Sequence, residues 1–77
     1  MAGIDTATGL AKVRALVESG AARSIRLAAG LSLAETAAAC GVSVSTMFRW
    51  EARERRPHGE PALRYLDLLE RLMGVPR

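Results

Sequence analysis

The chain has 77 residues, which is enough for one small domain with a thin core and too few for a second core. Charged residues make up 25% and hydrophobic residues 49%, a balance that is typical of a folded globular domain rather than of a disordered chain. Eleven basic and eight acidic residues give a net charge of +3, which is too small to establish nucleic-acid binding by itself.

The first part of the chain is expected to hold a flexible arm and two helices. We expect residues 1–7 to form the arm and residues 8–74 to form the domain. Apolar residues at three- and four-residue spacing, from Leu10 to Val17, predict a helix over residues 8–19. A second helix is expected over residues 21–29, with Ile25 and Ala28 buried. Ser19-Gly20 is a weak break, so one continuous bent helix is an open alternative.

Two further helices have clear start and stop signals. Ser32 is a suitable N-cap and Glu35 follows three residues later, which predicts a capping box and a helix that ends at Cys40, before Gly41. Ser43 then caps a helix over residues 44–53. After a loop that contains Pro57 and Gly59, we expect a last helix over residues 61–73, because proline is favoured in a first turn.

Residues 32–53 therefore form two short helices joined by a tight turn at Gly41. Met47 and Trp50 fall on one face of the second helix, as core residues do, and leave an opposite face that is exposed. A turn of three or four residues sets two helices nearly perpendicular, so the second can project outward. A projecting helix has the width of the major groove of B-DNA.

The basic residues are unevenly distributed. Between Ser19 and Phe48 the only acidic residue is Glu35, and a cluster of arginines then follows, interleaved with Glu51 and Glu54. Such a patch attracts phosphates. A solvated surface with ion pairs between neighbouring residues explains the same pattern, so charge alone leaves both interpretations open.

The stretch from Arg23 to Gly74 resembles the phage repressor and Cro-like helix-turn-helix family. The matching residues are Gly30-Leu31-Ser32, Glu35, Ala37, Gly41-Val42-Ser43, Ser45-Thr46, Arg49-Trp50-Glu51 and Arg56-Pro57. The resemblance implies an all-α, compact bundle of about five short helices, a lambda-repressor-like domain with an additional N-terminal helix. It also implies a sequence-specific regulator that binds double-stranded DNA without a cofactor, with a recognition helix over residues 44–53. Family members are usually dimers, and residues 61–73 or the N-terminal helix are the candidate contacts.

By resemblance, three groups of residues have roles. The base-facing positions are Val44, Ser45, Phe48 and Arg49. The positions near the phosphate backbone are Ser43, Thr46, Arg53, Arg55, Arg56 and His58. Arg26 and Glu51 match a buried structural ion pair.

The sequence departs from the family at three places. Leu33 replaces a glutamine that often contacts phosphate, and Thr36 replaces a core leucine. Ala52-Arg53 replaces a frequent ending with glycine, so the recognition helix is expected to run longer.

Other functions are less well supported by the residues. The single cysteine, Cys40, excludes an internal disulfide, and a single histidine with scattered carboxylates forms no catalytic group, so we expect no enzyme, metal or small-molecule ligand. No apolar run is long enough for a membrane span, and we expect a cytoplasmic, nucleoid-associated protein. An excisionase-like or recombination-accessory protein and an antitoxin-type protein-binding module remain the alternatives.

Overall fold

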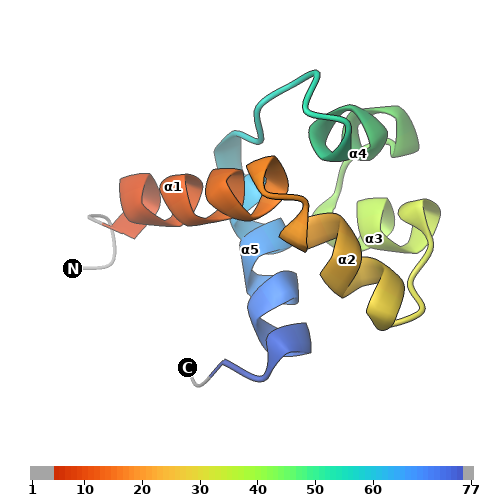
Figure 1. The fold of residues 1–77 in the computed structure, drawn as a ribbon. Coiled ribbons are helices and arrows are strands. Elements are labelled where there is room, and N and C mark those ends of the chain that lie inside the picture. Colours follow the sequence, from red (N-terminus) through yellow and green to blue (C-terminus); the bar gives the residue numbers. More distant parts are fainter. Residues whose placement is uncertain (1–4, 76–77) are drawn as a thin grey trace.

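A computed structural model describes residues 5–75, and in this range every regular element is an α-helix (Figure 1). The helices are α1 (Asp5–Glu18), α2 (Ala21–Ala28), α3 (Leu33–Cys40), α4 (Val44–Glu51) and α5 (Gly59–Met73). The all-α class and the five-helix bundle expected from the sequence are therefore confirmed.

The boundaries of the first two helices differ from the expected ones. α1 begins at Asp5, so residues 5–7 are helical rather than part of an arm, and residues 1–4 lie outside the described range. Thr6, Ala7 and Thr8 are exposed, and apolar spacing gives no signal where no side chain is buried. Gly20 has a φ of 84°, a left-handed conformation that ends α1, so α1 and α2 are separate helices.

The capping signals around α3 and α4 operate as local hydrogen bonds. The Ser32 hydroxyl accepts from the Glu35 backbone N–H at 2.9 Å, and the Glu35 carboxylate accepts from the Ser32 N–H at 2.9 Å. The Ser43 hydroxyl accepts from the Thr46 N–H at 3.1 Å. These bonds satisfy N–H groups that a helix start leaves unpaired, and they fix where both helices of the motif begin.

The helix expected over residues 44–53, which is α4, ends at Glu51 and does not reach Arg53. The Glu54 N–H donates to the Arg49 carbonyl at 2.9 Å, and the Arg53 N–H donates to the Trp50 carbonyl at 3.0 Å. This is the Schellman pattern of a helix end, in which the residue after the cap is left-handed. Arg53 takes that conformation with a φ of 63°, although it is not glycine.

The core lies where α1, α4 and α5 meet. Val13, Met47, Trp50, Tyr65 and Leu69 are fully buried there, and the rings of Trp50 and Tyr65 stack with centroids 6.0 Å apart. α5 starts at Gly59 instead of Pro61 and packs against α1, α2 and α3. Its central place lets it support α1 on one side and the helix-turn-helix on the other (Figure 1).

The buried face of α2 differs from the expected one. Ala22 and Arg26 are buried, whereas Ile25 is partly buried against the core and Ala28 is exposed. Thr36 of α3 is also buried, and its hydroxyl donates to the Ser32 carbonyl at 2.9 Å, so this polar side chain is accommodated without loss of a hydrogen bond. None of the described helices has the length and apolar character needed to cross a membrane.

Candidate nucleic-acid interface

α4 has one face in the core and one face in solvent. Met47 and Trp50 are buried, whereas Val44 and Phe48 are 46% and 52% exposed. Ser45 and Arg49 lie on the exposed side with them. The structure thus brings the four positions that the resemblance marks as base-facing onto one solvent-exposed surface of the helix.

A shallow groove runs along this surface. It is lined by Leu33, Val44, Ser45, Phe48, Arg49 and Glu54. Leu33, which stands where the family often has glutamine, is partly buried and adds an apolar wall from α3. Arg49 forms no ion pair with any residue in the described range, although Glu54 lines the same groove. Its guanidinium is therefore free to bind a ligand.

The hydroxyls at the start of α4 are engaged in capping. Besides accepting from the Thr46 N–H, the Ser43 hydroxyl donates to the Thr46 hydroxyl oxygen at 3.1 Å. Ser43 is exposed and Thr46 is partly buried. Both groups therefore stabilise the helix start, and they also place polar oxygens beside its unpaired N–H groups.

A buried ionic cluster holds α4 against the rest of the domain. Arg26 Nε donates to Glu51 Oε2 at 2.7 Å, and Arg26 Nη2 donates to Glu51 Oε1 at 2.9 Å. The side chains of Arg26 and Glu51 are only 6% and 5% exposed. The Tyr65 hydroxyl donates to Glu51 Oε2 at 2.8 Å, and Arg26 Nη1 donates to the Leu31 carbonyl at 2.8 Å.

The cluster shifts the pKa values of Arg26 and Tyr65. The hydrogen bond to Glu51 raises the pKa of Arg26, while burial followed by the bond to Glu51 raises the pKa of Tyr65 well above its usual range. Arg26 therefore stays charged and Tyr65 stays neutral under physiological conditions. The cluster ties α2, α4 and α5 together and sets the direction in which α4 presents its exposed face.

The loop after α4 places three arginines in solvent. Arg53, Arg55 and Arg56 are exposed, as is His58, whose Nδ1 lies 3.3 Å from the Arg56 carbonyl oxygen. Arg55 and His58 also line a hollow between α4 and the start of α5, together with Thr46, Arg49 and Trp50. The positions that resemblance assigns to the phosphate backbone thus adjoin the groove on α4.

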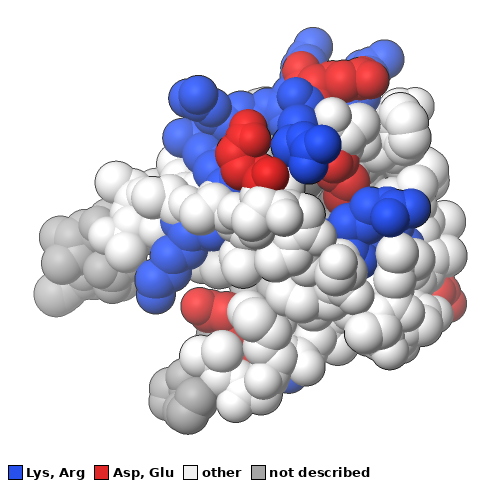
Figure 2. All heavy atoms as spheres, viewed as in Figure 1, with Lys and Arg blue, Asp and Glu red and all other residues white. Residues whose placement is uncertain are grey.

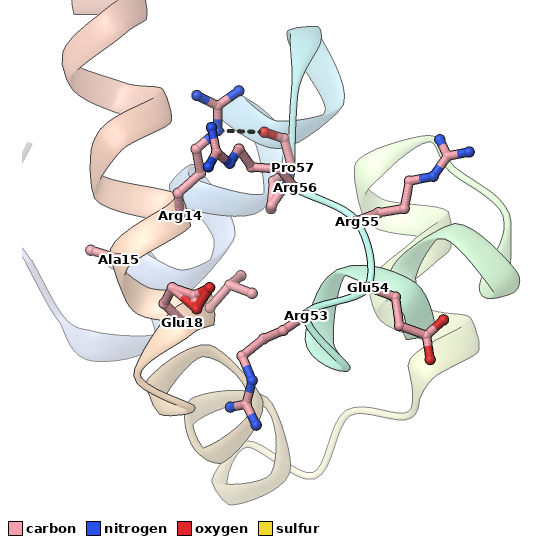
Figure 3. A pocket seen from close by; sticks show the side chains of 9 residues that line it. Arg14, Ala15, Glu18, Arg53, Glu54, Arg55, Arg56 and Pro57 are labelled. Carbon is pink, nitrogen blue, oxygen red and sulfur yellow. Dashed lines mark hydrogen bonds between the residues drawn. The ribbon is translucent and has the colours of Figure 1, made fainter.

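Arg14 also reaches this loop, and the sequence analysis did not identify it. Its Nε donates to the Pro57 carbonyl at 2.8 Å across 43 residues of sequence (Figure 3). Helical spacing placed Arg14 beside the apolar stripe of α1 but carried no information about its partner. In Figure 2, basic side chains gather over the end of α1 and this loop, at the top of the view.

Comparison with known proteins identifies one family. A family model described as helix-turn-helix matches residues 23–77, which include most of α2 and all of α3 to α5 and exclude α1. Neither the curated proteins nor the solved structures include a significant match to the chain.

Proposed function

Since the chain belongs to the Cro- and repressor-like helix-turn-helix family, we propose that it is a sequence-specific transcription regulator that binds double-stranded DNA. One observation carries the proposal: α4 is fixed by a buried ionic cluster and turns an unpaired arginine and two exposed apolar side chains outward. We also propose that the protein is cytoplasmic and that, when it is bound to DNA, it is associated with the nucleoid.

In this proposal α4 lies in the major groove and reads bases directly. Arg49 can donate two hydrogen bonds to O6 and N7 of guanine, the commonest specific contact in protein–DNA complexes. Phe48 and Val44 can pack against the methyl group of thymine, and Ser45 can bond to either kind of base. The groove wall formed by Leu33 would add apolar contact where a glutamine is customary.

Contacts to the sugar–phosphate backbone would position α4. Ser43 and Thr46 lie at the N-terminal end of the helix, where free N–H groups favour an anion. The proposed contacts in the loop are Arg53, Arg55, Arg56 and His58. Such contacts supply affinity that does not depend on sequence and that falls as salt concentration rises.

We also propose that two copies bind together. Leu72, Met73 and Val75 are exposed at the end of α5, so this helix still offers apolar surface after the monomer has folded. A two-fold symmetric pair would present two copies of α4 about one turn of DNA apart and would prefer a palindromic site.

Selection of bound duplexes from a random pool tests the proposal. We expect an enriched palindrome whose half-sites contain a guanine that Arg49 contacts, and binding that weakens steeply with salt. An enriched site without symmetry would instead favour a recombination-accessory role. Absence of any enrichment would overturn the proposal and favour a protein-binding module of the antitoxin type.

A further inference from the structure

A pocket between α1 and the loop after α4 is lined by more basic than acidic side chains. The loop contributes three arginines to it and α1 contributes a fourth (Figure 3). The charged residues that line it are Arg14, Glu18, Arg53, Glu54, Arg55 and Arg56. Because α1 lies outside the matched residues 23–77, the family resemblance assigns a role to the loop arginines of this pocket but none to Arg14.

The pocket has an excess of positive charge, because four arginines and two carboxylates line it. In residues 5–75 the ion pairs involve Arg26, Arg64 and Arg71, and none involves an arginine of the pocket. Two carboxylates line the same pocket without coming within ion-pair distance of these arginines. An excess of positive charge around one hollow attracts an anion.

Arg14 is held ready for such an anion. Its Nε bond to the Pro57 carbonyl fixes the side chain against the loop and leaves the two terminal nitrogens without a hydrogen bond in the described range. A guanidinium that is already ordered loses little conformational freedom when it binds. Its planar, multi-donor head suits the oxygens of a phosphate.

We propose that this pocket binds a phosphate of the DNA backbone and that Arg14 contacts it directly. The inference rests on the proposed function, because it extends the backbone contact of the same loop. Arg55 lines both this pocket and the hollow beside Arg49 and Thr46, so the two basic regions are continuous around the loop. The additional helix α1 thereby becomes part of the DNA-binding surface.

The test measures the dissociation constant for a duplex by fluorescence anisotropy over a series of salt concentrations. Arg14→Gln should reduce the slope of log Kd against log salt by about 0.9, the value for one phosphate contact. Lys12→Gln is the matched control, since it removes the same charge from an exposed position two residues away, on the opposite side of α1. The slope for Lys12→Gln should equal that of the parent.

Two further variants separate direct contact from an indirect effect on the loop. Arg14→Lys keeps the charge, so it should keep the parent slope. Glu18→Gln leaves the Arg14–Pro57 bond in place and removes a carboxylate from the pocket, so it should strengthen binding at low salt. It also keeps the test valid if Arg14→Gln fails to fold.

Each outcome bears on one of the two proposals. A parent protein that shows no salt-dependent binding to any duplex would contradict the proposed function. A parent that binds, with an unchanged slope in Arg14→Gln, would overturn only the phosphate pocket. A slope that falls equally in Arg14→Gln and Arg14→Lys would assign the effect to a displaced loop and would also overturn the direct contact, as would unchanged or weaker binding by Glu18→Gln.

Discussion

The Glu51 carboxylate accepts hydrogen bonds from two different elements, through Arg26 of α2 and Tyr65 of α5, and itself belongs to the last turn of α4. Burying a carboxylate is expensive unless it is paired and hydrogen-bonded. All three donors to Glu51 are part of one network, so the cluster acts as a single support for α4. Removing one member should therefore cost more than an exposed ion pair is worth.

We predict that Arg26→Met lowers the free energy of unfolding by about 3–5 kcal/mol, because Glu51 is then left charged and buried without its main partner. Urea unfolding followed by circular dichroism measures this loss. The double variant Arg26→Met, Glu51→Leu should recover part of it, since no charge remains to be buried. An Arg26→Met variant as stable as the parent would show that the pair contributes nothing to the fold.

Arg49 should contribute to sequence preference rather than to general affinity. Arg49→Ala is expected to cost about 1–3 kcal/mol on the selected duplex and much less on a random duplex, because only the former offers a guanine to the guanidinium. Arg55→Ala is the control, and it should weaken binding to both duplexes similarly through a lost phosphate contact. Equal losses of Arg49→Ala on both duplexes would contradict base readout.

The thiol of Cys40 should report on unfolding rather than on redox conditions. The side chain is fully buried, and this burial raises its pKa to about 11. At pH 7 only about one thiol in ten thousand is then the reactive thiolate. We expect alkylation in native buffer to be very slow and to become rapid in urea, at the concentration where circular dichroism shows unfolding. Rapid alkylation of the native protein would show that α3 opens locally.

At the scale of elements, the end of α4 carries conformational strain. Arg53 adopts the left-handed conformation that the Schellman end requires, and for a residue with a Cβ this costs about 1–2 kcal/mol. The strain persists because Glu54 and Arg53 N–H groups satisfy two carbonyls of the helix. This turn therefore sets the direction in which the loop that carries Arg55 and Arg56 leaves α4.

Arg53→Gly is therefore predicted to stabilise the fold by up to about 1 kcal/mol and to raise the melting temperature by about 4–8 °C. Arg53→Ala should give no such gain, because alanine keeps the Cβ that causes the strain. Differential scanning calorimetry of the two variants beside the parent decides the matter. If both variants melt at the same temperature, the strain at this position is negligible.

Elements with local signals were predictable from the sequence. Ser32 with Glu35 and the start at Ser43 act through bonds that span three residues, and both appear as expected. The end of α4 could not be predicted, because the usual sequence signal for a left-handed helix end is a glycine and this position holds Arg53. The sequence left the effect of Gly20 open, and its left-handed conformation in the structure separates α1 from α2.

Features that depend on distant partners could not be predicted from periodicity. The buried face of α2 was expected at Ile25 and Ala28, but Arg26 is buried because Glu51, 25 residues away, neutralises it. Only the family resemblance indicated this pair. Arg14 had no such signal, because its partner is a backbone carbonyl 43 residues away. Such pairings come from tertiary structure alone.

At the scale of the whole molecule, α1 is part of the core although the family match begins after it. Val13 and Val17 of α1 are buried, and α1 packs against both α2 and α5. The approach to α5 is close, because a Cβ added at Gly9 would lie 2.8 Å from Leu63 Cδ2. A chain of 77 residues has little apolar surface to spare, so burial of α1 supplies a substantial share of its stability.

Val13→Ala tests whether α1 unfolds with the rest of the domain. The side chain is fully buried, so removing two methyl groups should lower the free energy of unfolding by about 2 kcal/mol. The same change at exposed Val75 is the control and should cost much less. If α1 belongs to one cooperative unit, the near-ultraviolet signal of Trp50 and the helical signal shift together to lower urea. A shift in the helical signal alone, with Trp50 unaffected, would mean that α1 melts separately. The phosphate pocket would then lack a rigid wall, since Arg14 is held in place by the same docking of α1 that buries Val13.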